Sequence, residues 1–162
     1  MKKNIFKLLK FFLFFVVFLS SCKTEKECDT STESLVKINF YVMTESLDSA
    51  VIVKPISAYG VGHKDSLLYE NDSISFVLLP LSPNGETTEF AFEIGPYTEN
   101  ILFTYKTTTY FESKECGFIA NYEIESVSYS TNIIDTLIII NNEVTVENED
   151  HVKLFFVNNN LK

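Results

Sequence analysis

Leu35-Val-Lys-Ile-Asn-Phe-Tyr-Val42 is the stretch that decides the fold, because apolar and polar side chains alternate along it. Successive side chains of a β-strand point to opposite faces, so every second residue shares a face. One face of this stretch would be apolar: Val36, Ile38, Phe40 and Val42. A period of two predicts a strand with one buried face, whereas a helix repeats about every 3.6 residues.

Further short apolar segments follow, with turn-forming residues between them. The expected strands are 51–53, 66–69, 73–79, 89–94, 101–105, 118–129, 133–140, 144–146 and 151–157. The expected turns are 70–72, 83–85, 95–96 and 141–142. Asn tolerates positive φ, so Asn141-Asn142 predicts a hairpin between its flanking strands. We expect a single antiparallel β-sandwich, immunoglobulin-like or transthyretin-like, with about seven to nine strands over residues 35–162.

The first 22 residues are of a different kind. A lysine-rich head precedes the apolar run Phe11–Leu19, and Leu19-Ser-Ser-Cys22 closes the segment. This pattern resembles a bacterial lipoprotein signal, in which cleavage makes an acylated Cys22 the first residue. A transmembrane anchor is the alternative, but a bilayer core needs about 20 apolar residues and the run is about half that length. We expect residues 1–21 to be the signal peptide and Cys22 to carry the lipid.

Removal of the signal makes the chain more acidic. The signal holds four of the thirteen Lys, which leaves nine Lys against twenty-two Asp and Glu, a formal charge of −13. No Arg is present, so nucleic acid is a poor partner. The same charge repels anionic headgroups, so the acyl chains would hold the protein to the membrane while its domain stands away. Residues 23–34 contain no Ile, Leu, Val or aromatic residue, and we expect 22–34 to be a polar tether.

Two cysteines remain in the mature chain, Cys28 and Cys116. An envelope location is oxidising, so we expect them to form a disulfide that fastens Cys28 to the sandwich. A redox-active thiol is the alternative, but the Cys-x-x-Cys spacing is missing.

Candidate chemistry is sparse. His63 lies in a glycine-bearing loop and His151 begins a strand, and we expect a solvated loop residue and a strand-edge residue. Oxygen ligands for calcium could come from one acidic segment: Glu143, Glu147, Asn148, Glu149 and Asp150. The Asp-x-Asp-x-Asp-Gly loop and the nucleophile and phosphate motifs are missing, so we expect no catalytic residue, no metal site and no cofactor.

Aromatic residues raise the alternative of a sugar-binding surface. Five lie on or beside expected strands: Tyr105, Tyr110, Phe111, Tyr122 and Tyr129. Strand aromatics mostly fill cores and cross-strand pairs, and Trp, the best stacking residue, is absent.

Four tripeptides resemble the periplasmic O-glycosylation acceptors of Bacteroidota, which have Asp, then Ser or Thr, then a small or apolar residue. They are Asp48-Ser-Ala50, Asp65-Ser-Leu67, Asp72-Ser-Ile74 and Asp135-Thr-Leu137. A turn that leads into an apolar strand explains the same residues. The hypothesis is that at least one acceptor carries a hexose-sized addition in the native protein: Ser49, Ser66, Ser73 or Thr136.

An acylated cysteine followed closely by Cys28 and the strand 35–41 resembles the start of a family of uncharacterised Bacteroidota lipoproteins. Further matches are Asp65-Ser-Leu-Leu-Tyr69, Cys116-Gly-Phe118 and the segment 142–154. The resemblance implies an envelope location and a β fold. That family has no assigned activity, so the resemblance implies no catalytic residue.

Two function classes therefore stay open. The favoured one is a noncatalytic binding or structural module, held to the membrane through Cys22, with an envelope protein as partner and a glycan as second choice. The alternative is a carbohydrate-binding protein or a hydrolase with convergent carboxylates. Lys23 follows Cys22 where Asp would signal inner-membrane retention, so we expect the outer membrane, on its periplasmic or exposed side.

Overall fold

The first sheet is organised around β1 (Leu35–Met43), whose buried residues follow the predicted alternation. The computed structural model describes residue 28 and residues 31–43 and 48–157. On one edge β1 pairs in parallel with β11 (Val152–Phe156). On the other edge it pairs antiparallel with β5 (Phe76–Pro80) and β2 (Asp48–Ala50). β9 (Ile134–Ile139) then extends the sheet beyond β11.

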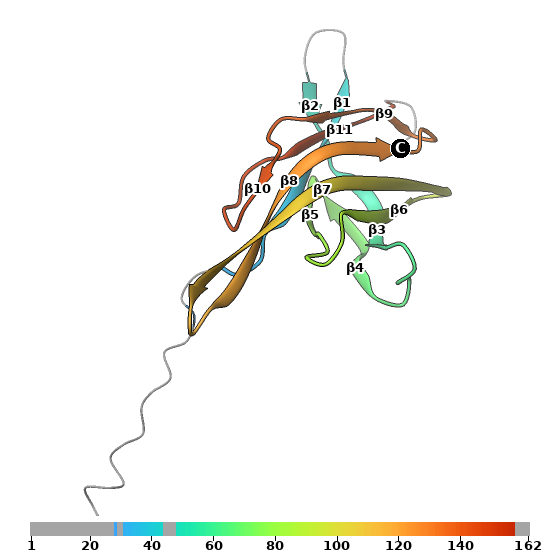
Figure 1. Ribbon diagram of the computed structural model, residues 1–162. Helices are drawn as coiled ribbons and strands as arrows, with labels where there is room; N and C mark the ends of the chain where they lie inside the picture. The colour runs from blue at the N-terminus through green and yellow to red at the C-terminus, as the bar shows by residue number, and fades with distance from the viewer. Residues whose placement is uncertain (1–27, 29–30, 44–47, 158–162) are drawn as a thin grey trace, which may run out of the picture.

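The second sheet is antiparallel and has six strands, in the order β10-β8-β7-β6-β3-β4. Their bounds are Glu143–Val144 for β10, Gly117–Tyr129 for β8, Tyr97–Ser113 for β7, Thr87–Ile94 for β6, Val53–Gly60 for β3 and Leu67–Ile74 for β4. The long β7–β8 hairpin twists and projects from the body of the domain (Figure 1).

The core lies between the two sheets and is rich in aromatic side chains. Phe40 and Phe156 of the first sheet meet edge to face with ring centroids 5.5 Å apart. Phe90 and Phe103 of the second sheet make the same kind of contact at 6.3 Å. Full burial of each such side chain contributes about 1.5–3 kcal/mol, so this layer supplies much of the stability of the fold.

The predicted all-β sandwich is confirmed, but the described residues form eleven strands rather than seven to nine. The expected strand 73–79 is divided at Ser75 between β4 and β5, which belong to different sheets. The expected strand 51–53 is likewise divided, because β2 ends at Ala50 and β3 begins at Val53. Pro55 lies within β3 but outside both of its ladders, where its missing N–H is not needed.

Two of the predicted turns are wrong. Asn141 and Asn142 do not close a hairpin, because β9 pairs with β11 in the first sheet and β10 pairs with β8 in the second. The segment crosses between sheets, and the Asn142 carbonyl accepts a hydrogen bond from the Ile124 N–H at 2.8 Å. At 70–72 the chain does not turn back: Asn71 has a φ of 52° and forms an irregularity within β4.

A buried carboxylate fixes the crossing between β8 and β9. Glu99 of β7 is fully buried. Its Oε1 accepts hydrogen bonds from the N–H groups of Ile133 and Ile134, the latter at 3.2 Å. Its Oε2 accepts from the Ser130 hydroxyl and from Asn132 Nδ2, the latter at 3.5 Å. One carboxylate therefore satisfies four donors in a loop that joins the two sheets.

We predict that Glu99→Gln lowers the free energy of unfolding by about 2–3 kcal/mol, because the amide presents an N–H₂ group to donors that need acceptors. Chemical denaturation would measure the loss. Glu86→Gln is the control, since Glu86 is exposed and a change there should stay within about 0.5 kcal/mol. Equal stability of the two variants would contradict the role of Glu99.

Candidate functional site

The outer half of the β7–β8 hairpin carries an uncovered apolar face. Phe111 and Phe118 are paired across the hairpin, with ring centroids 5.4 Å apart. They are 56% and 73% exposed. Because side chains alternate along a strand, Phe118 shares its face with Ala120 and Tyr122 of the same strand. Tyr122 belongs to the core. The core-facing stripe of the hairpin thus continues past the end of the core.

An open cavity of about 580 Å³ lies against this face, and we call it the hairpin cavity. Its walls are mostly apolar: Leu35 of β1, Leu68 of β4, Leu78 and Pro80 of β5, Leu81 and Pro83 of the next loop, and Phe118, Ala120 and Tyr122 of β8. Thr32, Glu33, Ser34 and Thr109 supply its polar groups. Volumes of this size are typical of sites that hold a small ligand or a few side chains.

Tyrosine hydroxyls hold the wall of the hairpin cavity in place. Tyr122 donates a hydrogen bond to the Leu81 carbonyl at 3.0 Å, and Tyr105 donates to the Ser82 carbonyl at 2.9 Å. The Tyr69 hydroxyl accepts from the Leu78 N–H at 2.8 Å. Burial raises the pKa of Tyr122 above its ordinary value of 10, so its hydroxyl remains a donor to a higher pH than that of an exposed tyrosine. The cavity is therefore built into the fold.

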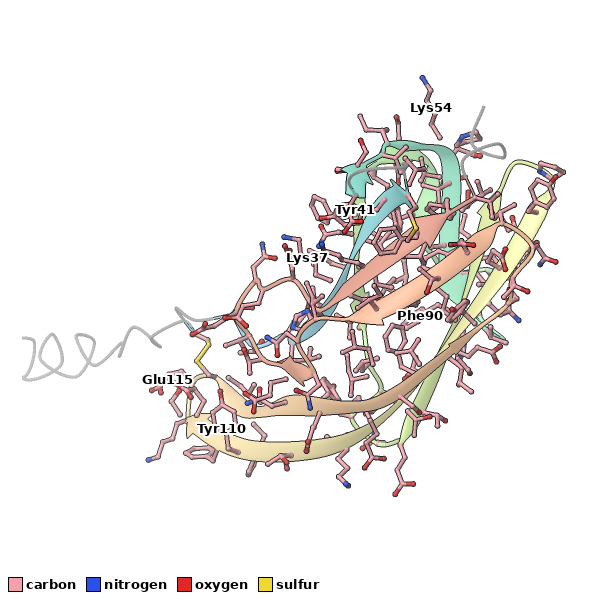
Figure 2. All side chains as sticks on the ribbon, turned by 90° about the horizontal axis from the view of Figure 1, so that it is seen from above. Lys37, Tyr41, Lys54, Phe90, Tyr110 and Glu115 are labelled. Carbon is pink, nitrogen blue, oxygen red and sulfur yellow. A yellow bond between two sulfur atoms is a disulfide. The ribbon has the colours of Figure 1, made fainter. Side chains whose placement is uncertain are left out.

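The expected disulfide between Cys28 and Cys116 is present, with a Cα–Cα distance of 4.9 Å. It lies beside Glu115 at the end of the hairpin (Figure 2). The Ser113 hydroxyl accepts a hydrogen bond from the Cys116 N–H at 3.0 Å and shapes the turn. The bond spans 88 residues, so in a chain-entropy model it stabilises the fold by about 4.5 kcal/mol.

Ser34, just before β1, is also attached to the hairpin. The Ser34 hydroxyl lies 3.3 Å from Asn121 Oδ1 of β8 and donates to it. Ser34 is buried, whereas residues 31–33 are exposed. Residues 32–34, the last part of the expected polar tether, therefore line the hairpin cavity.

Comparison with protein families gives one match. The model of a family of unknown function, DUF6452, matches residues 53–156. The chain belongs to this family. No curated protein and no solved structure matches it. The DUF6452 match spans β3 to β11 and includes Cys116, whereas Cys28 and β1 precede it.

Cys22 and the expected signal peptide, residues 1–21, lie outside the described residues of this DUF6452 protein. Within the part of the chain that is described, no helix has the length and apolarity needed to cross a membrane. Of the expected glycan acceptors, Ser49, Ser66 and Ser73 are exposed on β2, before β4 and within β4. Thr136 of β9 is half-buried.

The five aromatic residues considered as a sugar platform do not share one surface. Tyr105 and Tyr122 are buried and pack edge to face at 5.3 Å. Tyr129 is half-buried. Tyr110 and Phe111 are exposed near the hairpin end, but as neighbours in one strand they point to opposite faces. Only Phe111, with its partner Phe118, extends the face of the hairpin cavity.

The acidic residues considered for calcium are also dispersed. Asp150 forms an ion pair with Lys37 at 2.9 Å, and hydrogen bonding to that ammonium lowers the pKa of the carboxyl. Glu149 accepts a hydrogen bond from Asn141 at 2.7 Å. Glu143 lies opposite Glu123 in the β10–β8 ladder. Among the described residues, no three His, Cys, Asp or Glu side chains are placed to share a metal ion.

The two histidines differ in environment. His63 is exposed in the β3–β4 turn, as the sequence predicts. The prediction of a strand-edge residue at 151 is wrong: His151 is 1% exposed, and its backbone is hydrogen-bonded to Lys37 on one side and to Ile140 and Asn141 on the other. Its Nδ1 accepts a hydrogen bond from the Lys37 N–H at 3.0 Å, which requires that Nδ1 carries no proton. Neither histidine lines the hairpin cavity.

Burial lowers the pKa of His151 below its ordinary value of 6.5, although the Glu143 backbone, Glu149 and Asp150 oppose the shift. Above pH 6.5 the ring is neutral in both the folded and the unfolded chain. Below pH 6.5 the unfolded chain binds the proton first, so the free energy of unfolding should fall by up to about 1.4 kcal/mol per pH unit. The fall ends once the pH drops below the folded pKa.

We predict that His151→Asn, which keeps an acceptor for the Lys37 N–H, removes this slope between pH 6.5 and about 5. Urea denaturation over that range would measure it. His63→Asn is the matched control and should keep the wild-type slope, because His63 is exposed. A His151→Asn variant with the full slope would show that other groups cause the pH dependence.

Proposed function

We propose that this DUF6452 protein is a lipid-anchored cell-envelope protein that works by noncatalytic binding, and that the hairpin cavity is its binding site. The observation that carries the proposal is the cavity itself. Its walls are mostly apolar, and hydrogen bonds of buried tyrosines fix them before any ligand arrives. A preformed site loses little conformational entropy on binding, which favours affinity.

The chemistry of the lining supports binding over hydrolysis. Glycoside hydrolysis uses two carboxylates on either side of the scissile bond. The hairpin cavity has one carboxylate, Glu33. A nucleophile with an adjacent histidine base is the other common hydrolytic arrangement, and the lining contains no histidine.

The same lining favours a protein partner over a glycan. A sugar needs a flat ring to stack on and many hydrogen-bonding groups around it. Phe118 is the one aromatic side chain of the lining with a free face, because Tyr122 is buried and its hydroxyl is already bonded to Leu81. Leucine and proline side chains form most of the remaining wall. These fit apolar side chains of a partner protein.

The anchor has a direct test. Cys22→Ala should abolish incorporation of a radiolabelled fatty acid and move the protein from the membrane to the soluble fraction, since one or more acyl chains are the proposed attachment. Thr24→Ala is the matched control, because it changes a residue close to Cys22 that carries no lipid and should leave labelling and fractionation unchanged. Membrane retention of the Cys22→Ala variant at unchanged mass would contradict the anchor.

Binding through the hairpin cavity predicts position-specific crosslinks in living cells. A photoreactive residue at Thr109, which lines the cavity, should capture one discrete partner. The same residue at Lys54, which is exposed at the far side of the molecule, should not (Figure 2). Ala120→Trp fills the cavity and should abolish the Thr109 adduct. An adduct that forms equally from Lys54, or that survives Ala120→Trp in a folded protein, would contradict the assignment.

A further inference from the structure

Three exposed aromatic side chains mark the far end of the β7–β8 hairpin. Tyr110, Phe111 and Phe118 are 37%, 56% and 73% exposed, and we call them the aromatic tip. We propose that the aromatic tip inserts into the headgroup region of the membrane that carries the anchor. This inference rests on the proposed lipid anchor, and it places the domain on the bilayer by its hairpin end.

The side chains of the aromatic tip are exposed to solvent. Phe118 is the most exposed of the large hydrophobic side chains among the described residues, and Phe111 lies directly across from it. Tyr110 points to the opposite face of the hairpin, so both faces present an aromatic ring. Amphipathic and aromatic rings are favoured at the membrane–water interface. Headgroups would surround an inserted hairpin end, so aromatic rings on both of its faces would contact them.

The position of the disulfide is a second observation. Cys116 lies two residues before Phe118 in the chain and is bonded to Cys28. Cys28 follows Cys22 by six positions in sequence, which is a reach of at most about 20 Å. The proposed acyl chains are therefore tied covalently to the tip itself. The hairpin also projects from the body, so its end can reach the surface first (Figure 1).

Charge is consistent with this orientation. The tip region carries one lysine, Lys114, between Glu112 and Glu115, so its net charge is small. Most of the acidic residues lie on the body of the domain. The length of β7, 17 residues, holds that body away from anionic headgroups, so repulsion and insertion of the tip do not conflict.

Single tryptophans provide the test, because the chain contains none. Phe118→Trp reports on the tip. Tyr97→Trp is the matched control, because Tyr97 is 37% exposed and begins β7 at the opposite end of the hairpin. Full-length lipidated protein would be placed in phosphatidylcholine vesicles with brominated acyl chains. We expect blue-shifted, quenched emission at position 118 and unchanged emission at position 97.

Flotation of the same samples distinguishes the insertion of the tip from the lipid anchor. Protein that floats without quenching at position 118 overturns the insertion and leaves the anchor intact. Protein that does not float overturns the anchor. Equal quenching at both positions overturns the orientation, and a concentration-dependent blue shift at position 118 without lipid assigns the tip to a second copy of the chain.

A double variant tests the contribution of the two phenylalanines. Phe111→Ser with Phe118→Ser should still float, because the anchor is untouched, and should fold, because both rings are largely exposed. The loss of apolar burial should increase tryptic cleavage at Lys114 on vesicles by on the order of tenfold relative to wild type. Cleavage at Lys64, which is exposed in the β3–β4 turn, should stay constant. Unchanged protection of Lys114 would overturn the proposal.

Discussion

The first sheet depends on β1 more than on any other strand. β1 pairs with β2, β5 and β11, and β9 joins the sheet only through β11. Its apolar face also packs against the second sheet, through Val36, Ile38 and Phe40. A strand buried on one face and paired on both edges tolerates one register, because a shift of one residue would turn its apolar side chains outward. The alternation at 35–42 therefore fixes the frame on which the cavity is built.

Local pattern predicted the fold class and much of the strand content, because period-two alternation is a property of a strand by itself. Which strands pair with each other is not determined by local sequence. The turn at Asn141-Asn142 has hairpin chemistry, but the strand that pairs with β9 is β11, which follows a further crossing. The burial of Glu99 and His151 depends on the same crossings, so the neighbours of these residues in sequence do not predict it. The disulfide was predictable from cysteine count and the expected compartment, whereas the hairpin cavity required five distant segments to meet.

One hairpin carries both the proposed binding site and the proposed membrane contact. Near the body, its inner face packs into the core through Tyr105 and Tyr122. Farther out, the same face becomes a wall of the hairpin cavity at Ala120 and Phe118. Its end is covalently joined to Cys28. The three tasks follow one another along this hairpin, and Phe118 belongs both to the cavity wall and to the aromatic tip. A ligand in the cavity would therefore lie close to the proposed anchor.

The parallel pairing of β1 with β11 also governs when the domain can form during synthesis. β1 leaves the ribosome first among the described strands and β11 last, so more than a hundred residues must be made before the two can meet. Until then the apolar face of β1 and its open edge are exposed to other chains. The hairpin of the second sheet has local contacts and can form earlier. The first strand of this chain therefore stays without its parallel partner until its last strand arrives.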